Sequence, residues 1–335
     1  MNARLTVPLV AALALVSVAI SARAPAPATP TWAPAGALTA SSTDVPVPTR
    51  SRWVPPRDRE FLGGDTWGWG ITVYADETRV QTVGLAVAPR KDGKGTLTVL
   101  EEHGVGRRGP SVRTAHEVEL PFRPHHVTSA GLDRFALVGR DVEERVVLET
   151  WALVDDPEGD LADAPTDAGA LAAALDEELT AEDARSLLAA AVPRSFRRTP
   201  LSAGTLGESV SCLQYGSGGR FLLFVTKDGE RATLHQLPLD PVLETAVVTT
   251  SDEHPELDRM VGVDAFWQEG LGVFYEFHPR LEELGSVGLV LVDADDDGRI
   301  DDILTGTEDE LRTQGVGGYG ECHPLFLRPL PTAGR

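Results

Sequence analysis

The sequence predicts a mainly β fold, in which antiparallel blades form a propeller-like repeat domain, or a related sandwich if the units pair face to face. Short alternating or β-branched segments follow one another from Trp53 onward, separated by Gly, Asp and Pro. Two strand–turn–strand units recur at a fixed offset, and one Ala- and Leu-rich segment interrupts the pattern. We therefore expect a β-repeat domain over residues 51–330 that carries a helical hairpin insert over 160–195.

The predicted strands have the usual length of strands in globular proteins, and turn residues separate them at hairpin spacing. They lie at 70–74, 82–87, 95–100, 135–138, 145–148, 221–225, 273–277 and 287–292.

The internal repeat relates two of these units at an offset of 86 residues, from 134 to 220. The matches are Arg134-Phe135 with Arg220-Phe221, Leu137 with Leu223, Glu144-Arg145 with Glu230-Arg231, and Leu148 with Leu234. Three-strand units also fit residues 68–103 and 262–304. Regular all-β units of about 40 to 50 residues favour a propeller.

The composition limits the classes of partner. Hydrophobic residues make up 42% of the 335-residue chain and charged residues 24%, which excludes wholesale disorder and a multi-span membrane protein. The chain has 30 basic and 51 acidic residues, a formal net charge of −21. Such a surface repels phosphate backbones and attracts divalent cations. We expect no nucleic-acid partner.

The N-terminal region has the pattern of an export signal. Residues 1–22 combine a short basic start with the uncharged apolar run Leu5–Ala22, and small residues close the run. An uncleaved membrane anchor is the alternative, since 18 apolar residues can just span a bilayer. Residues 23–50, rich in Pro, Ala and Thr, are predicted to be a linker. The expected location is secreted, periplasmic or at the cell surface, with membrane contact only through an uncleaved N-terminal segment.

The predicted insert contains helices within Thr166–Ala191, which lacks β-branched runs and is followed by Pro193. Thr180, with Asp183 three residues later, resembles a capping box and marks the start of a second helix. Residues 155–183 carry 11 acidic side chains and no basic one. This segment is either a solvated helical hairpin or a docking arm for a basic partner.

An aspartate-rich loop carries the strongest chemical pattern in the chain. Residues 293–302 read Asp-Ala-Asp-Asp-Asp-Gly-Arg-Ile-Asp-Asp. A loop that wraps Ca²⁺ needs oxygen ligands at alternate positions, Gly at the sharp turn and an apolar anchor near its end. The pattern places Asp293, Asp295, Asp297 and Asp301 at positions 1, 3, 5 and 9, Gly298 at 6, the Arg299 carbonyl at 7 and Ile300 at 8.

These residues resemble the calcium loop shared by EF-hands, dockerins and the FG-GAP repeats of integrin-like propellers. Leu304 stands at position 12, so the bidentate Glu of a full EF-hand is missing. The flanks 287–292 and 300–304 have strand patterns, and one copy of the loop is present, which disfavours a dockerin. The resemblance implies a nine-residue FG-GAP-type loop between two strands. The alternative is an acidic hairpin tip, although six aspartates in ten residues repel one another strongly without a cation.

The two cysteines, Cys212 and Cys322, are predicted to form a disulfide in an exported protein, and two separate buried thiols are the alternative. His125-His126 is interpreted as a turn after Pro124 rather than a metal site.

The spacing of residues along the chain shows no convergent set of catalytic acid and base. We expect a calcium-binding module or scaffold that recognises a glycan, a wall component or an extracellular protein. The alternative is an extracellular hydrolase or lyase that uses acidic residues in the channel of a propeller.

Overall fold

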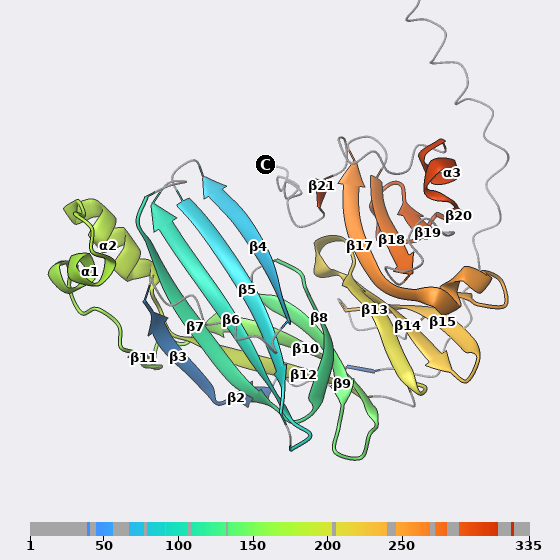
Figure 1. The fold of residues 1–335 in the computed structure, drawn as a ribbon, viewed down its shortest axis with the longest axis horizontal. Coiled ribbons are helices and arrows are strands. Elements are labelled where there is room, and N and C mark those ends of the chain that lie inside the picture. The colour runs from blue at the N-terminus through green and yellow to red at the C-terminus, as the bar shows by residue number, and fades with distance from the viewer. Residues whose placement is uncertain are drawn as a thin grey trace, which may run out of the picture. The chain divides into compact units, whose positions relative to one another are not determined.

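The computed structural model describes residues 39–40, 45–55, 67–76, 79–90, 92–105, 109–131, 133–202, 206–239, 246–268, 272–279, 288–313 and 323–324. The mainly β prediction is confirmed, because four sheets account for most of these residues (Figure 1). Each of the eight predicted strands falls on an observed strand. Residues 1–38 lie outside the described part, so the signal peptide stays a prediction.

The four sheets are numbered here in chain order. Sheet 1 has the order β11 (Leu161–Ala162), β3 (Thr49–Val54), β7 (Ser111–Leu120), β6 (Gly95–Val105), β5 (Arg79–Pro89) and β4 (Trp67–Asp76). Sheet 2 has the order β1 (Thr39–Ala40), β12 (Arg194–Ser202), β10 (Val146–Asp155), β9 (Arg134–Arg140) and β8 (Arg123–Ser129), and β2 (Val45–Val47) also pairs with β12.

Sheet 3 has the order β13 (Ser209–Tyr215), β14 (Phe221–Asp228), β15 (Arg231–Pro238) and β16 (Ala246–Thr250), with the short 3₁₀ turn η1 (Ser217–Gly219) before β14. Sheet 4 has the order β20 (Asp302–Gly306), β19 (Gly288–Asp293), β18 (Gly272–Pro279), β17 (Met260–Gln268) and β21 (His323–Pro324). The turn η2 (Pro255–Arg259) precedes β17, and the short helix α3 (Glu308–Thr313) follows β20.

Each sheet contains a four-strand antiparallel meander that follows chain order almost without interruption. Two core clusters join consecutive sheets. One cluster packs Leu97 and Leu120 of sheet 1 against Phe135 and Trp151 of sheet 2. A second joins sheet 2 to sheet 3, and its members include Ala136, Val138, Leu148, Leu222, Phe224 and Leu237. Several antiparallel sheets are thus present as predicted, whereas their arrangement as the blades of a propeller, or as the alternative sandwich, remains a prediction.

The two units of the internal repeat are both hairpins, as predicted. The first is β9–β10 and the second is β14–β15, and each pairs its strands antiparallel around a charged turn. Both hairpins contribute to the same core cluster between sheets 2 and 3. Of the repeated Leu and Phe positions only Leu148 belongs to this cluster. Phe135 and Leu137 belong to the cluster between sheets 1 and 2, and Phe221, Leu223 and Leu234 are buried.

Strands begin inside the segment predicted as a linker. β2 pairs antiparallel with β12 of sheet 2, and β3 pairs antiparallel with β7 of sheet 1. Only Pro48 separates these two strands. Alternation in 49–54, where Ser51, Trp53 and Val54 are buried, was hidden in the sequence by the surrounding Pro and Thr residues.

The helical insert is confirmed and consists of α1 (Ala168–Leu175) and α2 (Ala181–Ala190). The Thr180 hydroxyl accepts a hydrogen bond from the Asp183 backbone N–H at 3.1 Å, and donates to the Asp183 carboxylate at 2.7 Å. This is the predicted helix cap. Leu171 and Leu187 are buried in a cluster with Trp53, which holds the hairpin on sheet 1. A docking role for its acidic surface stays a prediction.

A buried charged network joins sheet 1 to sheet 2. His116 of β7 lies 3.0 Å from the Glu101 carboxylate through Nε2 and 2.9 Å from the Ser51 hydroxyl through Nδ1. Arg194 of β12 donates two hydrogen bonds to Glu101, at 3.1 and 3.2 Å. The Ser51 hydroxyl also donates to the Arg194 carbonyl at 3.1 Å and accepts from its N–H at 3.3 Å. Strand β3 is thereby tied to the first residue of β12.

The environment of Glu101 keeps it ionised although it is only 2% exposed. Burial opposes ionisation, but the hydrogen bond from His116 and the charges of Arg194, His116 and His103 outweigh it and hold the pKa of Glu101 below its usual value. A buried carboxylate of this kind is stabilised only while its partners remain in place.

Glu101→Gln should therefore lower the free energy of unfolding by about 3 kcal/mol, because it leaves the buried part of Arg194 without a full counter-charge. Glu102→Gln is the matched control on the same strand. Its carboxylate pairs with Arg113 at 3.1 Å in a partly exposed site, so the expected loss is about 1 kcal/mol or less. Urea unfolding of both variants measures the difference, and equal losses would contradict a buried role for Glu101.

A buried histidine in sheet 3 predicts a pH dependence of stability. His235 of β15 stacks on Phe224 with ring centroids 5.1 Å apart, and its Nε2 lies 2.7 Å from the Thr226 hydroxyl. Burial lowers the pKa of His235 to about 4. An unfolded chain binds this proton near pH 6.5, so the folded state loses stability as the pH falls from about 6.5 to about 4.

The difference between wild type and His235→Gln should isolate this term. We expect the wild type to lose about 2–3 kcal/mol more than the variant between pH 7 and pH 4, since the other ionisable groups contribute equally to both proteins. Urea unfolding at several pH values, with chelator present throughout, measures the two curves. Parallel curves would show that His235 does not titrate as its burial requires.

Candidate metal site

The Asp loop (residues 293–301) joins β19 to β20, which pair antiparallel. The predicted strand flanks are therefore confirmed. Two residues give the loop its tight turn, because Asp296 has φ 58° and Gly298 has φ 90°. A side chain at Gly298 would be strained by this backbone, and its Cβ would lie 3.4 Å from the Phe221 ring. Ile300 is buried, as the predicted anchor of the loop.

Three carboxylates converge in this loop. Asp293, Asp295 and Asp297 each offer an oxygen, and these oxygens all lie within 4.8 Å of one another. Asp293 is fully buried, and the other two are exposed. Asp293 Oδ1 has no hydrogen-bond partner among the described residues, although it is buried. A buried carboxylate oxygen without a donor is a costly arrangement unless a cation binds it.

The local charges disfavour ionisation of Asp293. Burial, followed by the nearby negative charges of Asp296, Asp297 and Asp295, raises the pKa of Asp293 to about 6. The Gly298 N–H donates to Asp293 Oδ2 at 3.1 Å and offsets part of this effect. A divalent cation would reverse the balance, because it neutralises the charge that the neighbouring aspartates impose.

Backbone N–H groups hold the other carboxylates in place. The Asp297 N–H donates to Asp295 Oδ1 at 3.2 Å, and the Arg299 N–H donates to Asp297 Oδ1 at 2.8 Å. These bonds orient the two exposed side chains on the same side of the turn as Asp293.

The remaining predicted ligands have different positions. Asp301 accepts a hydrogen bond from the Ala294 N–H at 2.7 Å, so its carboxylate ties the two ends of the loop together and lies outside the group of three. The Arg299 side chain is exposed, with Nε 4.0 Å from Asp297 Oδ2. Metal ligation by Asp301 and by the Arg299 carbonyl stays a prediction.

Two side chains from sheet 3 also contact this loop, and no sequence pattern indicated either contact. Arg220 donates from Nη2 to the Asp296 carbonyl at 2.7 Å and from Nη1 to the Asp297 carbonyl at 3.4 Å. Gln236 of β15 donates to the Gly298 carbonyl at 2.6 Å. Arg220 belongs to the internal repeat, which signals a structural position, but no local pattern connects either residue to a loop 62 to 77 residues away.

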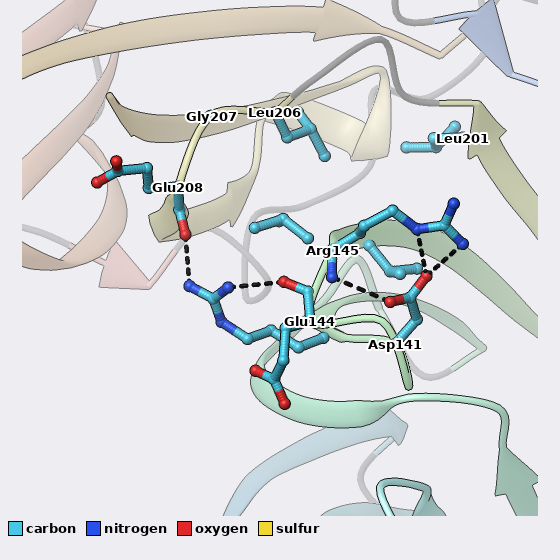
Figure 2. Close-up of a pocket in the computed structure, with 10 residues that line it drawn as sticks. Asp141, Glu144, Arg145, Leu201, Leu206, Gly207 and Glu208 are labelled. Carbon is cyan, nitrogen blue, oxygen red and sulfur yellow. Dashed lines mark hydrogen bonds and ion pairs between the residues drawn. The ribbon is translucent and has the colours of Figure 1, made fainter. Parts of the chain in front are cut away.

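A pocket of about 620 Å³ lies elsewhere, between the end of the β9–β10 hairpin and residues 206–208. Figure 2 shows Asp141 and Arg145 turned toward each other at its rim, and their closest atoms are 2.7 Å apart. Arg140 donates to the carbonyls of Glu144 and Glu208. Leu201 and Leu206 contribute apolar surface. Among the pocket's charged groups, Asp141 and Arg145 thus pair with each other, and the Glu144 carboxylate lies 3.4 Å from Arg123.

One prediction about the histidines is wrong. His125 and His126 lie within strand β8, next to a bulge between Pro124 and His126, rather than in a turn. The pKa values of both histidines are lowered, mainly by burial. No described metal-type cluster contains either residue.

Comparison with known proteins adds no family. No family profile matches this chain, and no curated protein is significantly similar to it. The Asp loop is therefore identified as a candidate metal site by its geometry alone. Each helix in the described part of the chain is too short or too polar to span a bilayer.

The structure describes only one of the two cysteines of the predicted disulfide, Cys212. Cys212 is buried in β13 without a disulfide partner among the described residues, and it lies at a bulge where its φ is 54°. Cys322 lies outside the described residues, so the bond stays a prediction. Burial raises the pKa of the Cys212 thiol to about 12, which removes the reactive thiolate at neutral pH.

In Cys322→Ser, Cys212 should react with iodoacetamide at pH 8 at least about 100-fold more slowly in the native state than in urea, since burial reduces both thiolate and access. Mass spectrometry of timed samples measures the two rates. Fast native labelling would contradict the buried thiol. Wild-type protein unfolded without reductant tests the disulfide separately, because a bonded pair leaves no thiol to label.

Proposed function

We propose that the Asp loop binds Ca²⁺ and that this protein is an exported, calcium-stabilised β-repeat module. The observation that carries the proposal is the group of three carboxylates, one of them fully buried with an oxygen that lacks any donor among the described residues. The ligands are all oxygen atoms, which suits a hard cation and not a thiol- or imidazole-seeking metal.

Calcium fits this loop better than magnesium. Ca²⁺ accepts six to eight oxygens in a flexible arrangement, whereas Mg²⁺ demands a small octahedral shell and keeps several waters. The Arg299 carbonyl and the Asp301 carboxylate are the proposed further ligands. Asp301 would exchange part of its hydrogen bond with the Ala294 N–H for the ion. The FG-GAP-type loop between two strands remains the closest description of this arrangement.

The wider function follows from the scaffold. Four meanders, with apolar cores between sheets 1 and 2 and between sheets 2 and 3, support a propeller-like repeat domain. In this domain the first strands of neighbouring meanders, β8 with β13 and β13 with β17, lie against each other. We propose export through residues 1–22 and a binding or scaffold role toward a glycan, a wall component or an extracellular protein. An extracellular hydrolase or lyase on the same scaffold is the alternative, and it requires an acid–base pair beyond the groups described above.

A calcium-dependent melting temperature tests the proposal. An ion held only by the native loop stabilises the fold by about 2.7 kcal/mol at 100 times its Kd, which corresponds to a rise of about 4 °C for a chain of this size. We expect Asp295→Asn with Asp297→Asn to abolish the rise, because the amides keep the loop's hydrogen bonds but lose its charge.

Glu177→Gln with Glu178→Gln is the control, since it removes two exposed charges from the helical insert and should leave the rise intact. Melting curves are recorded in chelator, in millimolar Ca²⁺ and in millimolar Mg²⁺. Identical wild-type curves in chelator and Ca²⁺ would overturn the proposal. A rise with Mg²⁺ alone would overturn the assignment of calcium.

A further inference from the structure

Three successive peptide groups of the Asp loop are each hydrogen-bonded at both ends. In the peptide between Asp296 and Asp297, the carbonyl accepts from Arg220 and the N–H donates to Asp295. In the next peptide, the Asp297 carbonyl accepts from Arg220 and the Gly298 N–H donates to Asp293. In the third, the Gly298 carbonyl accepts from Gln236 and the Arg299 N–H donates to Asp297.

This arrangement separates two sets of partners. Every donor to the three carbonyls comes from sheet 3, and every acceptor of the three N–H groups is a carboxylate of the candidate metal group. The left-handed backbone at Asp296 and Gly298 allows the turn. Each peptide dipole therefore has its negative end toward sheet 3 and its positive end toward the carboxylates, and hydrogen bonds in such a series strengthen one another.

The groups on sheet 3 are themselves fixed. Arg220 precedes β14, and its carbonyl accepts a hydrogen bond from the Leu239 N–H at 2.7 Å. Gln236 lies within β15, which is paired on both sides. Below them, Phe221 of β14 contacts Tyr275 of β18, with ring centroids 5.9 Å apart. A rigid sheet therefore presents these donors to a loop that belongs to the neighbouring sheet.

We propose that Arg220 and Gln236 are positioning residues of the cation site, and that cation binding in turn fixes the contact between sheets 3 and 4. The proposal rests on the proposed function, because it names how the same site is regulated. The two donors hold the three peptides in the orientation that keeps the carboxylates together. The bound ion holds the carboxylates, and through the same peptides it holds the carbonyls against sheet 3.

Thermodynamic linkage makes this coupling reciprocal. If the contact with sheet 3 raises the affinity for the ion by some factor, the ion stabilises that contact by the same factor. Partners of this kind behind metal ligands typically change metal affinity by 10- to 100-fold. The ion should stabilise only the contact between sheets 3 and 4, so we expect no effect of the ion on sheets 1 and 2.

The first measurement is Ca²⁺ affinity by calorimetric titration of the full chain after chelator treatment. We expect Arg220→Gln and Gln236→Leu each to weaken Ca²⁺ binding by about tenfold while the stoichiometry stays the same. Arg231→Gln is the matched control, because Arg231 lies on sheet 3 but pairs with Asp252 at 3.3 Å, away from the loop. Its affinity should equal that of the wild type.

The second measurement is hydrogen exchange of the wild type, which needs no variant to fold. Ca²⁺ should slow exchange in peptides that cover 216–222 and 236–239, where Gly216, Gly219 and Leu239 donate backbone hydrogen bonds. Exchange over 134–140 in sheet 2 should not change. In the Arg220→Gln/Gln236→Leu double variant, Ca²⁺ should no longer protect the two sheet 3 peptides.

The outcomes separate the two proposals. A wild type that takes up no Ca²⁺ refutes the proposed function, and the inference falls with it. A wild type that binds Ca²⁺ while both variants bind equally tightly, or while sheet 3 gains no protection, refutes only the inference. Tenfold weaker binding together with calcium-dependent protection of sheet 3 supports it.

Discussion

Burial of carboxylates is the constraint on which this structure depends. A carboxylate that leaves water loses solvation, and only donors or positive charge restore it. Glu101 and Asp293 are both almost completely buried. Glu101 meets Arg194 and His116, whereas Asp293 meets one N–H and three further aspartates. The same physical demand is satisfied by the chain's own groups at the first site, whereas at the second one carboxylate oxygen has no donor among the described residues.

Both carboxylates stand where one sheet meets another. Glu101 and its partners bind sheet 1 to the first residue of β12, and the Asp loop of sheet 4 receives donors from sheet 3. Apolar clusters join sheet 1 to sheet 2 and sheet 2 to sheet 3, but hydrophobic contacts are non-directional. The polar contacts fix which residues face each other. Buried apolar side chains therefore hold neighbouring sheets together, and the charged and hydrogen-bonded side chains fix how the sheets are aligned.

The sequence predicted what depends on local pattern. Alternation located the strands, composition located the helical insert, and spacing located Asp293, Asp295 and Asp297 together. The sequence did not predict the contacts that depend on strand register and on the packing of one sheet against another. Arg220 and Gln236 become neighbours of the Asp loop only after β14 and β15 pack beside sheet 4, and nothing in their own segments records that. His116 meets Ser51 because β3 and β7 align these residues as direct partners, 65 positions apart.

The connection between β2 and β3 has a mechanical consequence. These strands are separated by a single residue, Pro48, yet β2 is paired within sheet 2 and β3 within sheet 1. The Thr49 hydroxyl also accepts a hydrogen bond from the Phe196 N–H of β12 at 2.9 Å. A proline link has almost no slack, so the two sheets cannot slide apart without tearing a strand from one of them. A pull on the N-terminal segment would thus load the pairing of β1 and β2 with β12 in sheet 2 before it reached β3 in sheet 1.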